Sequence, residues 1–277
     1  MSKKRINLEN ATPNIVSRKE HVPSKIHADS LFNFMTELKY LTIIIKTKRI
    51  SARYCEENLE YLNIPKLRKI ALPMKCFCDI NMHKLEQHLE WYGYYGLAFS
   101  KEWGIQQGIQ PVQYINPSSN LVQDFVEAFK SAFLIKTSDI NSPQSKMQSF
   151  LLHELMYYKP HDGLIENRNT KIKQEKCFTD ECEWRYIPNV AKAGFHQVLR
   201  DEEIINKGVL EEMSNGLARA IDVALPFEYK DLKYIIIKEN EDLEILFREI
   251  KNLDISNDEK YYLISKIIVW ENAKGDF

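Results

Sequence analysis

Two carboxylates with the spacing of neighbours on one face of a strand stand in the segment FTDECEWRYIP, residues 178–188. If this segment is a strand, Glu181, Glu183 and Arg185 share one face and the two carboxylates lie about 7 Å apart. Such a pair can stabilise positive charge developing on a sugar ring and can orient or deprotonate an attacking group. Glu183 and Glu181 are therefore the candidate catalytic residues. The alternative is a solvated strand edge with a Glu–Arg pair, which contributes little stability.

A second candidate group is the run YGYYG at residues 92–96, with His88 one helical turn before it. The side chains of Tyr92, Tyr94 and Tyr95 can form a flat slot for a planar ring, and the glycines let the backbone approach closely. The alternative is a helix stop followed by a turn and ordinary core tyrosines. A lone histidine such as His88 is more often a partly buried residue than a catalyst.

The five cysteines do not form a metal motif. The Cys76-x-Cys78 spacing is tighter than the usual zinc ligand pair, and Cys177 and Cys182 are slightly too far apart. The histidines make no HExxH pattern, and the sequence has neither GxGxxG nor GxxxxGK[ST]. We therefore expect free thiols, no metal and no glycine-rich phosphate loop.

Composition narrows the class of protein without naming a function. The 277 residues carry 38 Lys+Arg and 39 Asp+Glu, a formal charge of −1, so no overall basic field marks a nucleic-acid binder. No apolar run approaches the roughly 18 residues that a membrane helix needs. The basic start MSKKRINLEN has no apolar region behind it and is not a secretory signal. We expect a cytoplasmic protein with no membrane contact.

The segments that must position these candidates are predicted to be mixed strands and helices. Strands are expected at residues 29–35, 72–80, 96–100, 111–115, 181–188, 232–238 and 267–270. Helices are expected after Thr36, at 82–92, 120–135, 145–158, 201–224 and 242–252, and after Asn257. Residues 101–108 and 159–180 have the composition of connections. This order predicts an α+β fold with a mixed or antiparallel sheet core and flanking helices.

The expected organisation is a flexible N-terminal arm, residues 1–25, followed by a single α+β domain at 26–277. The chain resembles the AbiGi abortive-infection family of phage-defence proteins over about residues 26–240. The blocks that carry the resemblance are Leu31–Phe34, Ser51–Glu57, Leu72–Ile80, His88 with YGYYGLAFSKEWG (92–104), QPVQY (110–114), ECEWRYIP (181–188) and DLKYIII (231–237).

The same layout resembles, more distantly, ADP-ribosyltransferases of the DarT type, which modify nucleic acid. That resemblance implies an ADP-ribosyltransferase-like domain with Glu183 as the catalytic glutamate and Glu181 as its companion in an ExE pair. The implied NAD-binding residues are Asn33, Phe34, His88, Tyr92, Tyr94, Tyr95 and Arg185. Asn33 stands where many relatives have a histidine; asparagine can hydrogen-bond a hydroxyl but does not titrate, so the implied site is either a variant or a decayed one.

Basic residues precede the carboxylate segment. Lys159, Arg168, Lys171, Lys173 and Lys176 can hold phosphates of NAD or of an RNA or DNA acceptor, and Arg168, Lys171 and Lys173 are the candidate nucleic-acid contacts. The alternative is a solvated loop.

The function implied by these resemblances is an anti-phage toxin, an NAD-dependent mono-ADP-ribosyltransferase. It would break the nicotinamide–ribose bond of its substrate NAD, without a metal, and modify RNA or DNA. The implied partners are NAD, a nucleic-acid acceptor and a cognate antitoxin or toxin protein. The alternative is a non-catalytic antitoxin or sensor of an abortive-infection toxin–antitoxin system, because the AbiGi family is often described as an antitoxin.

Overall fold

The computed structural model describes residues 22–167, 170–204 and 207–276. Nine strands form one large sheet: β1 (Ser30–Met35), β3 (Arg53–Asn58), β4 (Lys69–Cys78), β5 (Tyr95–Ser100), β6 (Gln110–Pro111), β11 (Glu183–Tyr186), β12 (Leu199–Arg200), β14 (Leu232–Ile237) and β15 (Ile267–Val269). Three further pairs are β2 (Arg49–Ile50) with β13 (Leu225–Pro226), β7 (Gln113–Ile115) with β8 (Tyr158–Pro160), and β9 (Asp162–Glu166) with β10 (Lys173–Cys177).

Ten α-helices flank these strands within the described ranges. They are α1 (Leu38–Thr47), α2 (Leu85–Tyr92), α3 (Lys101–Gln106), α4 (Asn120–Leu134), α5 (Pro143–Tyr157), α6 (Asp201–Ile204), α7 (Lys207–Arg219), α8 (Asn240–Lys251), α9 (Asn257–Ile264) and α10 (Trp270–Ala273). The α+β class predicted from the sequence is confirmed, and an ADP-ribosyltransferase-like fold stays a prediction. None of the helices in this part of the chain is both long and apolar enough to cross a bilayer.

The large sheet is built around β4. The strand order is β15-β14-β5-β1-β4-β11-β6, while β3 and β12 also pair with β4. The C-terminal half of β4 pairs with β1 and β11, and its N-terminal half pairs with β3 and β12. The sheet is mixed because β14 and β15 run parallel, whereas its other pairs are antiparallel.

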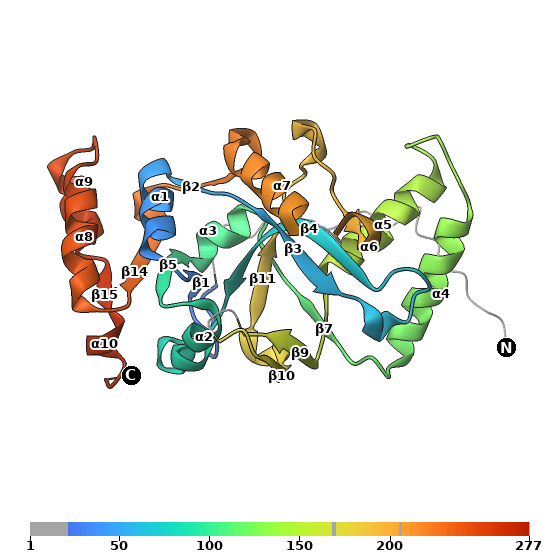
Figure 1. Ribbon diagram of the computed structural model, residues 1–277, viewed down its shortest axis with the longest axis horizontal. Helices are drawn as coiled ribbons and strands as arrows, with labels where there is room; N and C mark the ends of the chain where they lie inside the picture. Colours follow the sequence, from blue (N-terminus) through green and yellow to red (C-terminus); the bar gives the residue numbers. More distant parts are fainter. Residues whose placement is uncertain (1–21, 168–169, 205–206, 277) are drawn as a thin grey trace.

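Alternate residues of β1, β5 and β14 enter two cores on opposite faces of the sheet. Leu31, Leu97 and Ile235 join the core that includes residues of α1, α3, α8 and α9. Phe32 and Ile236 face the other way, toward α2 and α10. This period-two division follows from the strand pleat and gives three layers at this end of the molecule (Figure 1).

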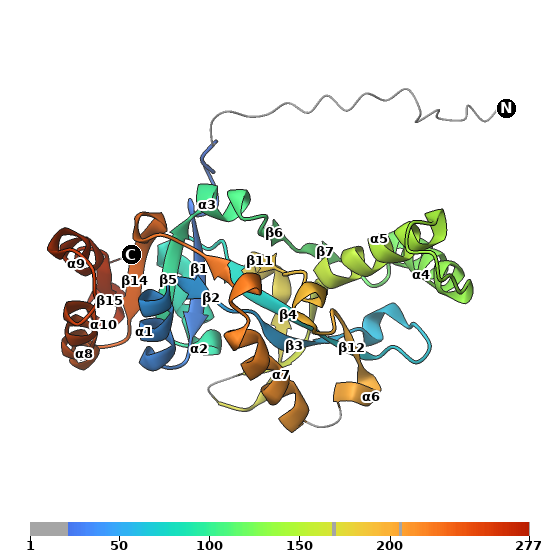
Figure 2. The same cartoon turned by 90° about the horizontal axis from the view of Figure 1, so that it is seen from above.

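A separate core lies at the opposite end of the molecule. The helical hairpin α4–α5 packs there on the N-terminal half of β4, with Leu72 and Met74 against Phe125, Phe129 and other apolar residues of the hairpin. Both views place α4 and α5 far from α8 and α9 (Figures 1 and 2). Helix α7 packs over β3 in a further apolar cluster.

Two connections predicted from the sequence are structured. Residues 101–106 form α3, because the Ser100 side chain caps the helix by accepting from the Trp103 N–H at 3.2 Å. Gly104 inside this helix makes room for Leu31: a Cβ there would lie 2.4 Å from the leucine Cδ1. The glycine therefore marks a close packing contact and not a turn.

Residues 159–180 were also predicted to be a connection, and most of them are structured. They include part of β8, the β9–β10 hairpin and a 3₁₀ turn, Phe178–Glu181. The strand predicted at 181–188 starts later, at Glu183, because Cys182 adopts a left-handed conformation with φ 43°. Residues 1–21 of the predicted arm fall outside the described ranges, and the single domain at 26–277 stays a prediction.

Candidate functional site

Both faces of β11 are covered. Trp184 and Tyr186 on one face pack against the large core. Glu183 and Arg185 on the other face are more deeply buried, with 6% and 0% of their surface exposed. The alternative of a solvated Glu–Arg edge is therefore wrong. Charged side chains remain buried in proteins when they are paired, so the partners of Glu183 and Arg185 define the site.

Lys159 joins the two candidate carboxylates. It lies on β8, which pairs in parallel with β7 and so approaches the start of β11. Its Nζ lies 2.5 Å from Oε2 of Glu183 and also donates to the carboxylate of Glu181. The structure thus brings Glu181 and Glu183 together, although Glu181 belongs to a 3₁₀ turn and not to the strand.

Arg185 fixes the far side of Glu183. Its Nε donates to Oε1 of Glu183 at 2.8 Å, and its Nη2 lies 3.0 Å from Oε1 of Glu57 on β3. Its Nη1 donates to the backbone carbonyl of Met156 at 2.7 Å. Arg185 therefore holds β11, β3 and the end of α5 together. Its side chain is not among those that line the cavity beside the carboxylates.

Glu181 has a second set of partners. Lys176 of β10 places its Nζ 2.8 Å from Oε1, and the hydroxyl of Tyr92 donates to the same oxygen. The Lys176 ammonium also lies 4.6 Å from the centre of the Trp91 ring and 4.5 Å from that of Tyr92. The β9–β10 hairpin is thereby tied to the end of α2.

The six charges form a balanced cluster of three acids, Glu57, Glu181 and Glu183, and three bases, Lys159, Lys176 and Arg185. Burial alone raises the pKa of Glu183, but Arg185 and Lys159 hold it well below its usual range. Burial also opposes ionisation of Glu181, and Lys159 and Lys176 lower its pKa. Both carboxylates are therefore ionised and engaged at both oxygens, which favours a structural role over proton transfer.

A cavity of about 410 Å³ opens beside this cluster, where β1 and β4 separate. Asn33 bridges the gap by donating from Nδ2 to the Cys76 carbonyl at 2.8 Å, and its buried Oδ1 has no hydrogen-bond partner among the described residues. Phe34, His88 and Tyr92 form an aromatic wall. The ring centre of His88 lies 5.6 Å from that of Phe34 and 4.5 Å from that of Tyr92. Burial lowers the pKa of His88 to about 3, so this imidazole is neutral near pH 7.

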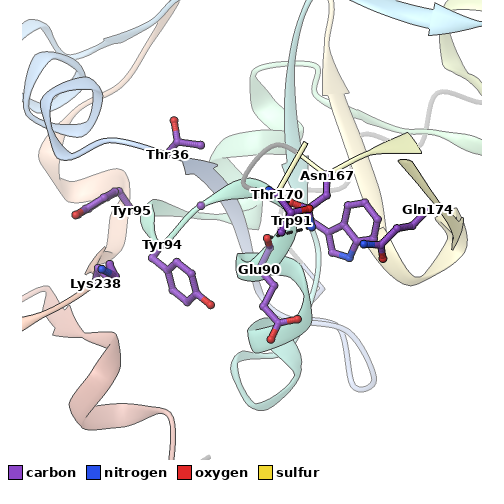
Figure 3. A pocket seen from close by; sticks show the side chains of 10 residues that line it. Thr36, Glu90, Trp91, Tyr94, Tyr95, Asn167, Thr170, Gln174 and Lys238 are labelled. Carbon is purple, nitrogen blue, oxygen red and sulfur yellow. Dashed lines mark hydrogen bonds between the residues drawn. The ribbon is translucent and has the colours of Figure 1, made fainter. Parts of the chain in front are cut away.

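The predicted aromatic slot does not form. Tyr92 ends α2 and faces the ion-pair cluster, whereas Tyr94 and Tyr95 follow Gly93, whose φ of 107° turns the chain. Figure 3 shows these two tyrosines in another pocket, of about 610 Å³, together with Trp91 and other residues. Tyr94 and Tyr95 therefore line a different pocket from the one that Asn33, Phe34 and His88 line.

The predicted basic phosphate-binding group is likewise divided. Lys159 and Lys176 are held in the buried cluster, while Lys171 and Lys173 are exposed on the β9–β10 hairpin. Arg168 lies outside the described residues. In the ranges that the structure covers, no three His, Cys, Asp or Glu side chains are placed to hold a metal ion.

Sequence reasoning missed Glu57 and the role of Lys159. Glu57 stands two residues after Cys55 on the half-buried side of β3, and that alternation was the signal available. Nothing near Lys159 in the sequence indicates its partners, which follow 22 and 24 residues later.

Comparison of the sequence with known proteins shows the family to which the chain belongs. Residues 48–238 match the family model described as "Putative abortive phage resistance protein AbiGi, antitoxin". An abortive phage resistance protein AbiGi from Lactococcus lactis subsp. cremoris is 32% identical over 245 residues, covering 81% of this chain and 98% of the relative. The chain belongs to the AbiGi family. No solved structure matches it.

The AbiGi resemblance inferred from the sequence is thus confirmed, and the similarity to DarT-type enzymes is not shown. The main functional expectation, a transferase toxin that modifies nucleic acid, is wrong: the AbiGi description names an antitoxin, which favours the alternative of an antitoxin or sensor. NAD as a ligand stays a prediction. The whole charge cluster falls inside the matched region, whereas Asn33 and Phe34 precede it.

Proposed function

We propose that this chain is the antitoxin of an abortive-infection toxin–antitoxin pair and that it acts by binding its cognate toxin protein. The family description supports the role. The single structural observation that carries it is the ion-pair cluster: the carboxylates of Glu181 and Glu183 are both bound to Lys159. Each oxygen of these carboxylates is bound by a cation or a hydroxyl, an arrangement that fits an ion-pair network that supports the fold.

On this proposal the cluster is structural support for a binding surface. Its ion pairs connect β8, β10 and β11 with α2 and β3, and this role requires no reaction at the carboxylates. Removing one charge from a buried pair costs stability, because the remaining charge stays buried and unpaired. A loss of function in cluster variants is therefore expected to follow a loss of folded protein and not a loss of a reaction step.

Bacterial growth tests the proposal. Expression of the chain alone is expected to be harmless, and its co-expression with its cognate toxin is expected to restore growth. The informative variant is Glu183→Gln, which keeps the side-chain shape but removes the charge. Its matched control is Glu175→Gln on the exposed part of β10.

Rescue by Glu183→Gln is expected to scale with the amount of folded protein, measured by immunoblot of the soluble fraction and by circular dichroism. Growth arrest caused by the wild-type chain alone would contradict the proposal. So would a Glu183→Gln chain that is folded and abundant but fails to rescue, because the carboxylate would then have a role beyond structure.

A further inference from the structure

The outer end of the α4–α5 hairpin carries an apolar surface that the large sheet does not cover. Six large apolar side chains are exposed around its turn, and we call them the hairpin-tip patch: Phe133, Leu134, Ile135, Ile140, Met147 and Phe150. Leu134 and Ile140 have 81% of their surface in water. Figure 2 shows the hairpin extending away from the sheet.

The turn that bears this patch is well supported. The amides of Gln144 and Gln148 donate to the backbone carbonyl of Ala132 at the end of α4, and Gln148 also donates to that of Ile135 at 2.9 Å. Ser142 caps α5 by accepting from the Ser145 N–H at 3.1 Å. A surface whose backbone is fixed in this way loses little entropy on binding.

The size of the patch lies at the upper end of what a soluble monomer exposes. With exposed fractions of 40% to 81%, the six side chains leave roughly 600 Å² of apolar surface in water. The largest apolar patch of a soluble monomer covers about 300–600 Å² and is itself often functional. Two such patches placed together bury about 1,200 Å², the lower bound for a stable specific interface.

The charge of the patch favours a partner with the same surface. Residues 133–150 carry three charged side chains, Lys136, Asp139 and Lys146, of both signs. In a two-fold contact the same surface meets a copy of itself, so a surface with little net charge meets little electrostatic repulsion. A strongly charged partner would find few opposite charges here.

We propose that the hairpin-tip patch is the contact between two copies of this chain, which form a two-fold dimer through α4 and α5. This inference is independent of the proposed antitoxin role. The test is the mass of the purified full chain at about 50 µM, by light scattering after size exclusion. The wild type is expected at twice the chain mass of 32.6 kDa.

The informative variant is Leu134→Glu with Ile140→Glu, which is expected to have the mass of a single chain. Its matched control is Ile43→Glu with Ile245→Glu, two exposed isoleucines on α1 and α8, which is expected to remain dimeric. Circular dichroism and thermal melting check that the variants fold. If the first variant does not fold, Met147→Lys with Phe150→Lys tests the same patch.

A monomeric wild type, or a patch variant that stays dimeric, overturns the proposal, as does loss of the dimer in the control. If the wild type is monomeric and the patch variant also fails to restore growth beside the toxin, the patch contacts the toxin, and the proposal of a second copy is wrong.

Discussion

The Nζ of Lys159 lies 2.5 Å from Oε2 of Glu183, although 24 residues separate the two along the chain. Their side chains are 9% and 6% exposed, so the pair lies away from water. Removing two charges from water is costly in free energy. The pair is stabilised by two further ion pairs, between Arg185 and Glu183 and between Lys159 and Glu181. The pair thus fixes where β8 meets β11.

Replacing Lys159 with methionine tests this arrangement. The variant leaves Glu181 and Glu183 buried with fewer cations, and the expected loss is about 3–5 kcal/mol of unfolding free energy. Urea denaturation followed by circular dichroism measures it. Lys173→Met on the exposed part of β10 is the control, with an expected change within about 0.5 kcal/mol. Equal midpoints for the two variants would show that the cluster contributes nothing.

The hydroxyl of Tyr92 is expected to contribute separately through its bond to the Glu181 carboxylate. Tyr92→Phe keeps the ring beside His88 and removes the hydroxyl, which donates to Glu181 and accepts from the Lys176 ammonium at 3.3 Å. A hydrogen bond to a charged group contributes about 1.5–3 kcal/mol, and the remaining bonds from Lys159 and Lys176 place the expected loss near the lower figure. Tyr261→Phe, at an exposed position of α9, is the control, and both are measured by urea denaturation. A Tyr92→Phe chain as stable as the control would refute the contribution.

His88 is expected to make stability depend on pH. Burial lowers its pKa from 6.5 to about 3, so between these values the unfolded chain binds a proton that the folded protein does not. The unfolding free energy therefore falls as the pH drops below 6.5. From pH 7.5 to 5.5 this residue contributes a loss of about 1.4 kcal/mol.

The variant that removes this dependence is His88→Phe, which keeps a ring against Phe34 and Tyr92. Its unfolding free energy is expected to change less between the two pH values than that of the wild type. The control is His83→Phe, at an exposed position before α2. The same pH dependence in wild type and His88→Phe would mean that His88 is protonated in the folded protein.

Gly93 is expected to tolerate no side chain. Its φ of 107° is a glycine conformation, and a Cβ there would lie 2.2 Å from the Met35 carbonyl oxygen and 2.7 Å from the Thr36 Cα. Gly93→Ala is expected to cost more than about 3 kcal/mol because backbone atoms must move. Gly108→Ala, also at positive φ but with nothing within 4 Å, is expected to cost about 1 kcal/mol. Thermal denaturation compares them, and equal losses would mean that the contact at Gly93 relaxes freely.

The sequence predicts the positions of most helices and strands better than it predicts which polar and charged side chains are buried. A short apolar run locates β1, all of whose residues are buried, and the apolar patterns of β14, α4 and α8 locate those elements closely. Apolar patterning fails for β9 and β10, whose exposed polar residues have no buried face. It also fails at Glu183 and Arg185, which are buried because of charges that lie elsewhere in the chain.

The candidate site shows the same division. Glu181 and Glu183 are two residues apart in sequence, and both bind Lys159, although Glu181 lies in a 3₁₀ turn and not on the strand. Tyr92 and His88 lie near them. Tyr94 and Tyr95 were grouped with Tyr92 because adjacent residues suggest a common surface, but the turn at Gly93 sends them to another pocket.

The long strand β4 has one more implication. It supplies residues to both the core under the α4–α5 hairpin and the cores beside β1, so neither end of the molecule has a sheet of its own. Melting of one end would leave half of this strand without neighbours. Amide protons along its whole length are therefore expected to exchange with solvent in a single cooperative opening.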